Sequence, residues 1–134
     1  MTAPVASPSR PAAVPSGTLV MVVDDDPMVR RLVRAVLEVD GVEVIEAADG
    51  HGALDIAGDV APAVVVLDVM MPGLSGVEVC RLLDHGRMKV VILTARDDRQ
   101  LDLACREAGA DAFLTKPFSS DELLAVLAEV IGGR

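Results

Sequence analysis

The chain has 134 residues, and its 21 Asp and Glu outnumber its 12 Lys and Arg, which gives a formal charge of −9. This length predicts one domain, and a hydrophobic share of 51% excludes a wholly disordered chain. The acidic balance argues against direct nucleic-acid binding, and the presence of only two aromatic residues, both Phe, excludes a site built on stacked rings.

The sequence shows no membrane or secretion signal. No apolar run approaches the roughly 20 residues that cross a bilayer, and the N-terminus lacks the apolar stretch of a signal peptide. Cys80 and Cys105 lie in apolar helical contexts without metal-ligand spacing, so we expect reduced thiols in the core. These features predict a cytoplasmic protein.

Composition divides the chain into a tail and a domain. Residues 1–17 hold four of the eight prolines among Ala, Ser and Val, which predicts a disordered or loosely extended tail. From residue 18 to residue 134, short apolar runs alternate with amphipathic stretches, and no internal repeat or second shift in composition occurs. We therefore expect one folded domain over 18–134.

The alternating pattern predicts an α/β fold. Five apolar, β-branched runs predict strands at 19–23, 42–47, 63–67, 89–93 and 111–115. Apolar residues at helical spacing predict five helices, at 29–36, 51–58, 76–84, 101–108 and 123–130. The first, third and fourth runs are the most apolar, as central strands are, so the prediction is a flavodoxin-like, doubly wound parallel sheet of order 2-1-3-4-5.

Polar side chains follow four of the five predicted strands. Asp24 and Asp25 follow the first strand, Asp68 the third, Thr94 the fourth and Lys116 the fifth. Ligands of such sheets bind beyond the carboxyl ends of the strands, where these side chains converge. An oxygen-only carboxylate cluster favours Mg²⁺, with Mn²⁺ as the alternative, and a carboxylate beside the ion can be the nucleophile in phosphoryl transfer. Lys116 and Thr94 would then hold the oxygens of the transferred group.

Four motifs carry a resemblance to a known family. They occupy residues 22–27 (VVDDDP), 67–76 (LDVMMPGLSG), 92–95 (ILTA) and 113–118 (FLTKPF), and each follows or ends a predicted strand. From residue 19 to residue 131 the chain closely resembles the receiver domain of bacterial two-component response regulators, of the stand-alone type.

The resemblance implies a role for each residue of the cluster. Asp68 would accept a phosphoryl group, and Asp24, Asp25, Asp68 and the backbone carbonyl of Met70 would hold Mg²⁺, with Asp24 acting chiefly through a metal-bound water. Thr94 would move toward the phosphoryl group. Lys116 would pair with it, after a cis peptide bond to Pro117.

The resemblance also implies a switch and two tuning positions. Phe113 would turn inward when Thr94 moves and so change the surface of the fourth helix, fifth strand and fifth helix. Met70 and Arg96 stand where the family tunes the removal of the phosphoryl group by water. Because Met70 has no polar group to place a water, we expect slow autodephosphorylation.

The implied partners are proteins. The donor would be a histidine kinase or a histidine phosphotransfer protein, and the downstream target is unknown. Arg30, Arg31 and Arg34 on the first helix are either a solvated face or a contact with the donor. The few residues after the fifth helix leave no room for an output domain, so we expect output by protein interaction or phosphoryl relay, as a monomer or a phosphorylation-dependent dimer, without membrane or nucleic-acid contact.

Two other functions remain open at the level of sequence. One is a phosphatase of the haloacid dehalogenase type, although Met28 departs from its Asp-x-Asp-x-Thr/Val signature and the chain is short for that fold. The other is a receiver-like binding module that is never phosphorylated. In the leading interpretation the protein is not an enzyme, because it catalyses only its own phosphorylation and dephosphorylation.

Overall fold

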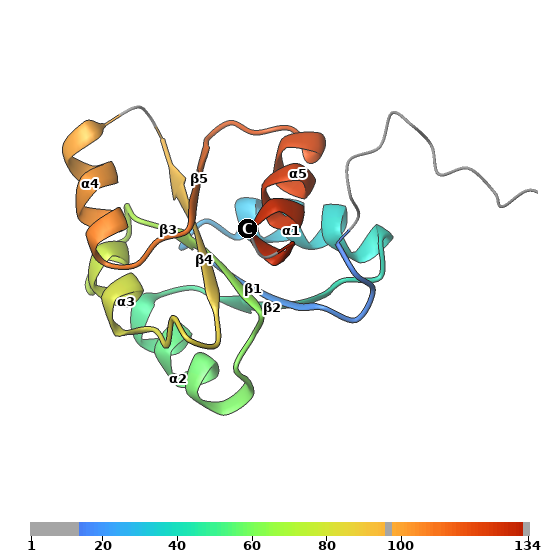
Figure 1. The fold of residues 1–134 in the computed structure, drawn as a ribbon, viewed down its shortest axis with the longest axis horizontal. Coiled ribbons are helices and arrows are strands. Elements are labelled where there is room, and N and C mark those ends of the chain that lie inside the picture. Colours follow the sequence, from blue (N-terminus) through green and yellow to red (C-terminus); the bar gives the residue numbers. More distant parts are fainter. Residues whose placement is uncertain (1–13, 96–97, 133–134) are drawn as a thin grey trace, which may run out of the picture.

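Five strands alternate with five helices in the computed structural model, which describes residues 14–95 and 98–132 (Figure 1). The strands are β1 (Leu19–Val23), β2 (Glu43–Ala47), β3 (Val64–Asp68), β4 (Lys89–Thr94) and β5 (Ala112–Thr115). The helices are α1 (Pro27–Val39), α2 (Gly50–Val60), α3 (Gly76–Leu82), α4 (Arg99–Glu107) and α5 (Ser120–Ile131). Every predicted element is present, and the observed bounds differ from the predicted ones only at the ends.

The sheet has the predicted topology. All of its strands are parallel, in the order β2-β1-β3-β4-β5. Every residue of β3 is buried, whereas β2 and β5 lie at the edges with several partly exposed residues. Because all five strands run in the same direction, their carboxyl ends lie at one edge of the sheet, and crossover helices join them.

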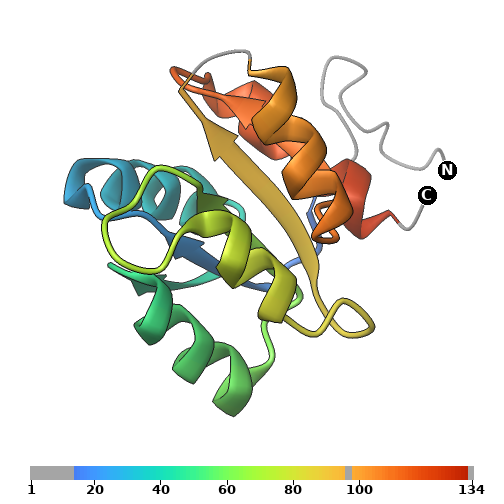
Figure 2. The same cartoon turned by 90° about the vertical axis from the view of Figure 1, so that its left-hand side faces the viewer.

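Helices cover both faces of the sheet. The core on one face takes Val33 from α1 and Leu123 from α5, and the core on the other takes Ala53, Val79 and Cys105 from α2, α3 and α4. Figure 2 looks onto the face covered by these last three helices. Cys80 and Cys105 are buried and free, as predicted. None of the helices in the described ranges is long and apolar enough to cross a membrane.

Side-chain caps set the helix starts. The side chain of Asp26 accepts a hydrogen bond from the backbone amide of Met28 in the first turn of α1. Ser119 and Glu122 form a capping box at the start of α5. A second box, formed by Ser75 and Glu78, starts α3. Such caps satisfy amides that have no partner within the helix.

Residues 14–17 belong to the fold although they lie in the predicted tail. Val14 is only 3% exposed and packs in the core on the side of α1 and α5. The amide of Gly17 donates a hydrogen bond of 2.9 Å to the carbonyl of Gly41. Removal of the apolar Val14 side chain from water stabilises this arrangement, so the folded part of the chain starts before residue 18. Residues 1–13 lie outside the described residues, and for them the tail stays a prediction.

Candidate functional site

The site lies at the carboxyl ends of the central strands, where the sequence places it. Asp24 and Asp25 follow β1, Asp68 is the last residue of β3, and Thr94 is the last residue of β4. In the register of the sheet, Asp68 pairs with Leu93, one residue before Thr94. Lys116 follows β5, and its backbone amide donates a hydrogen bond of 2.7 Å to the carbonyl of Thr94. All five predicted site residues therefore lie at one edge of the sheet.

The three aspartates form a compact group of carboxylates. Asp24, Asp25 and Asp68 each offer an oxygen atom, and these atoms lie within 4.8 Å of one another. Asp24 and Asp68 are buried, while Asp25 is exposed, so the group opens to solvent on one side. Three hard oxygen donors with access for water are the ligand set that Mg²⁺ prefers. The residues present thus fit the predicted cation.

Lys116 compensates the buried carboxylates. Its Nζ lies 2.8 Å from Oδ2 of Asp24 and 3.4 Å from Oδ2 of Asp68. Burial opposes the charge of Lys116, but the hydrogen bond to Asp24 and the two negative charges outweigh it, so the pKa of the ammonium group is raised. The peptide bond between Lys116 and Pro117 is cis, as predicted.

Both buried aspartates use their two oxygens in the same way. Oδ1 of Asp24 accepts the amide of Asp26 at 2.9 Å, and Oδ1 of Asp68 accepts the amide of Met70 at 2.9 Å. In each case Oδ2 faces Lys116. Burial, together with the charge of Asp24, raises the pKa of the Asp68 carboxyl despite the amide and the ammonium group. A carboxylate that is oriented by the Met70 amide through Oδ1, and whose Oδ2 faces the more distant ammonium group at 3.4 Å, is well placed to act as a nucleophile.

A cavity of about 320 Å³ lies beside the site. Its lining residues are Met70, Thr94, Ala95, Asp98 and Leu101. Of these residues, Thr94 is buried and Met70 is 67% exposed. Met70 offers only a thioether there, as the sequence indicates. The second predicted tuning residue, Arg96, lies outside the described residues.

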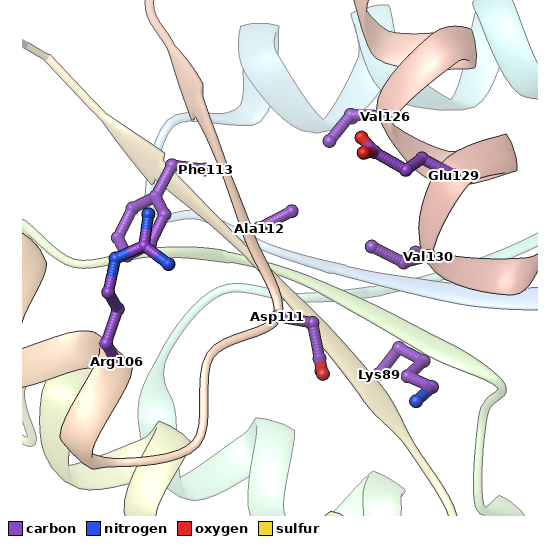
Figure 3. Close-up of a pocket in the computed structure, with 8 residues that line it drawn as sticks. All are labelled: Lys89, Arg106, Asp111, Ala112, Phe113, Val126, Glu129 and Val130. Carbon is purple, nitrogen blue, oxygen red and sulfur yellow. The ribbon is translucent and has the colours of Figure 1, made fainter. Parts of the chain in front are cut away.

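The predicted switch residue Phe113 has a partner that the sequence did not indicate. The guanidinium carbon of Arg106, on α4, lies 4.7 Å from the centre of the Phe113 ring, within the range of a cation–π contact. Both side chains line a pocket of about 420 Å³ between α4, β5 and α5 (Figure 3). This contact stabilises the half-buried ring on the side of β5 that faces α4, and it depends on how α4 packs, for which the sequence carries no signal.

Gly76 is a second residue of the site that sequence reasoning missed. A Cβ atom at this position would lie 2.6 Å from the backbone oxygen of Asp68, much closer than a side chain can approach. Glycine therefore allows the first turn of α3 to pack directly against the end of β3. The glycine stands in the 67–76 motif, but its spacing alone does not reveal a backbone contact.

Comparisons with known proteins agree with this geometry. Residues 20–128 match the family model of the response regulator receiver domain. The chain is 47% identical over 108 residues to the response regulator MprA of Mycolicibacterium vanbaalenii, an overlap that covers 79% of this chain and 47% of MprA. It is 43% identical over 111 residues to the transcriptional regulatory protein KdpE of Mycobacterium tuberculosis, with 82% of this chain and 49% of KdpE covered.

A solved structure matches over nearly its whole length. The chemotaxis protein CheY4 of Vibrio cholerae superposes with a TM-score of 0.82 and 30% sequence identity, covering 86% of this chain and 99% of that structure. By contrast, the chain spans about half the length of the curated relatives it matches.

Proposed function

The chain belongs to the response regulator receiver domain family, and from this we propose that Asp68 is the residue at which it accepts a phosphoryl group. The single observation that carries the assignment is the geometry of Asp68. It is a buried carboxylate with Oδ1 held by the Met70 amide and Oδ2 facing Lys116, next to two further carboxylates. The function is two-component phosphoacceptor signalling.

Asp68, Lys116 and Thr94 have different roles in the phosphoryl transfer. An oxygen of Asp68 attacks the phosphorus of a phosphohistidine, the bond to the ring nitrogen breaks, and the histidine leaves as its freed nitrogen takes up a proton. Lys116, which already lies between Asp24 and Asp68, pairs with an oxygen of the arriving group. The hydroxyl of Thr94 donates to another oxygen of the same group.

A divalent cation is part of the proposal. Asp24, Asp25, Asp68 and the carbonyl of Met70 would hold Mg²⁺, or Mn²⁺ in its place. Three carboxylates and one ammonium group leave two uncompensated negative charges, which a divalent cation offsets. When bound, the cation supplies electrostatic stabilisation of the oxygens of the transferred phosphoryl group.

The donor is proposed to dock at α1. This helix starts directly after the aspartate loop and exposes three apolar side chains, Met28, Leu32 and Val39. Arg31 is exposed beside them, whereas Arg30 and Arg34 both pair with Glu46 on β2. Of the three arginines, Arg31 therefore supports a contact with a histidine kinase or a phosphotransfer protein, and a cytoplasmic location follows from such a donor.

Phosphorylation is proposed to act through Thr94 and Phe113. Movement of Thr94 toward the phosphoryl group would free space for Phe113 to turn inward, which requires the ring to leave Arg106. The surface of α4, β5 and α5 would change and with it the affinity for a downstream protein. We also propose slow autodephosphorylation, because Met70 cannot hydrogen-bond an attacking water.

Phosphorylation with a small donor tests the function. The purified protein is incubated with Mg²⁺ and acetyl phosphate, and its intact mass is measured. The expected result is the addition of one phosphoryl group, which Asp68→Asn abolishes and Asp55→Asn, at an exposed aspartate on α2, leaves unchanged. No mass gain in the wild type would support a module that is never phosphorylated, and steady turnover of a small phosphate ester would support a phosphatase.

A further inference from the structure

A chain of ion pairs connects α1 and β2 to the loop that carries the acidic group. Arg34 binds Glu38 at 2.7 Å and Glu46 at 2.7 Å, and Glu46 in turn binds Nε of Arg30 at 3.0 Å. The pKa of Glu46 is lowered, first by its hydrogen bond to Arg34 and also by Arg30, so this carboxylate is charged at neutral pH. Arg30 is the most buried arginine of this series of ion pairs, with a side chain that is 17% exposed.

Arg30 makes a hydrogen bond to the aspartate loop that Arg34 does not make. Its Nη1 donates a hydrogen bond of 2.7 Å to the backbone carbonyl of Asp24. This carbonyl lies just beyond the last residue of β1, where the ladder to the neighbouring strands ends. A charge-assisted bond from a guanidinium is short and directional, and Glu46 fixes the same guanidinium from β2.

Asp24 is thereby held at all four of its polar atoms. Its amide donates to the carbonyl of Ala47, its carbonyl accepts from Arg30, and its two carboxylate oxygens accept from the Asp26 amide and from Lys116. The Asp24 carbonyl belongs to the same planar peptide unit as the amide of Asp25. Fixing this carbonyl therefore restricts the direction in which the exposed Asp25 carboxylate leaves the backbone.

We infer that Arg30 is a positioning residue for the group of Asp24, Asp25 and Asp68. Glu46 holds the Arg30 guanidinium in place, and Arg30 orients the aspartate loop through the backbone carbonyl of Asp24. The inference rests on the proposed cation site and adds a residue that does not itself touch the cation. Arg30 brings a positive charge near that site, so its charge alone would weaken cation binding. Its positioning role strengthens cation binding, and the two effects have opposite signs.

The two arginines provide a matched pair of variants. Arg30→Met and Arg34→Met each remove one guanidinium from Glu46 and one charge from α1, but only Arg30→Met removes the bond to Asp24. Thermal unfolding first establishes a temperature at which all the proteins are folded. Mg²⁺ binding is then measured by amide chemical shifts. We expect Arg30→Met to weaken binding by about tenfold, as loss of an outer partner of a metal ligand does, and Arg34→Met to change it less than twofold.

A measurement on the metal-free protein tests the role of Arg30 in the loop independently of the cation site. In the metal-free protein, hydrogen exchange at the amides of Asp24 and Asp26 should be faster in Arg30→Met than in Arg34→Met, because both amides are bonded within the held loop. Equal exchange in the two variants, or tighter Mg²⁺ binding by Arg30→Met, would overturn the positioning role. If the wild type bound no Mg²⁺ while exchange still differed, the cation site would fail and the role of Arg30 in the loop would stand.

Discussion

Lys116 lies closer to Asp24 than to Asp68, with its Nζ at 2.8 Å from the first carboxylate and 3.4 Å from the second. Asp24 is fully buried, so without this ammonium group its charge would have no cationic partner among the described side chains. The lysine that is proposed to bind the phosphoryl group thus has a second task in the unphosphorylated protein. It stabilises the arrangement of carboxylates on which cation binding depends.

Removal of this lysine should destabilise the fold. Lys116→Met leaves two buried carboxylates facing each other, which we expect to lower the free energy of unfolding by about 2 kcal/mol at pH 7 without Mg²⁺. This expected change in the free energy of unfolding is smaller than for a fully buried ion pair, because the lysine side chain is partly exposed to solvent. Urea denaturation measures it, and Lys89→Met is the matched control, because Lys89 is exposed at the start of β4. Equal effects of the two substitutions would contradict the compensating role.

Asp68 should reduce stability at neutral pH. Burial and the charge of Asp24 raise the pKa of Asp68 above its ordinary value, so the folded state favours the protonated form. Its contribution to stability is present in acid and is lost as the pH rises through the folded-state pKa. Without Mg²⁺ at pH 7, Asp68→Asn should therefore raise the Tm by about 2–5 °C, and the gap from the wild type should narrow as the pH falls. A Tm below that of the wild type at pH 7 would refute this.

The cysteines should be inert in the native protein. Burial, with a smaller effect of Cys105, raises the pKa of the Cys80 thiol to about 12, and burial also raises the pKa of Cys105. Almost no thiolate is then present at pH 8, and the thiolate is the reactive form. A soluble alkylating reagent should label neither cysteine in the folded protein and both in denaturant, as intact mass reports. Rapid labelling without denaturant would show that one of them is accessible.

Gly76 should not tolerate a side chain. Because a Cβ atom there would meet the backbone oxygen of Asp68 at 2.6 Å, Gly76→Ala should lower the free energy of unfolding by about 2 kcal/mol and weaken Mg²⁺ binding. Gly58→Ala on α2 is the control, since a Cβ atom there meets nothing within 4 Å. That substitution should stabilise the protein by up to about 1 kcal/mol through helix propensity. Similar effects at both positions would argue against a close contact at Gly76.

The features predicted correctly depend on local patterns. The most apolar runs became the central strands, and Asp68 and Thr94, predicted to follow their strands, are the last residues of β3 and β4. The contacts that were missed join a helix to the strand or loop next to it in sequence: Arg30 on α1 with the Asp24 carbonyl, and Arg106 on α4 with the Phe113 ring of β5. The sequence of a helix does not show whether a charged side chain is exposed to solvent or forms an ion pair with the sheet. Its partner is determined by how the helix packs against the sheet.

The central claim is that Asp68 is the phosphoryl acceptor, and chemical trapping tests it most directly. After phosphorylation with acetyl phosphate and Mg²⁺, borohydride reduces the acyl phosphate to an alcohol, so the modified aspartate becomes homoserine. Peptide mass spectrometry then gives its position. If Asp68 is the acceptor, homoserine appears at position 68 alone, with none in Asp68→Asn. Homoserine at position 24 or 25, or its persistence elsewhere in Asp68→Asn, would contradict the assignment.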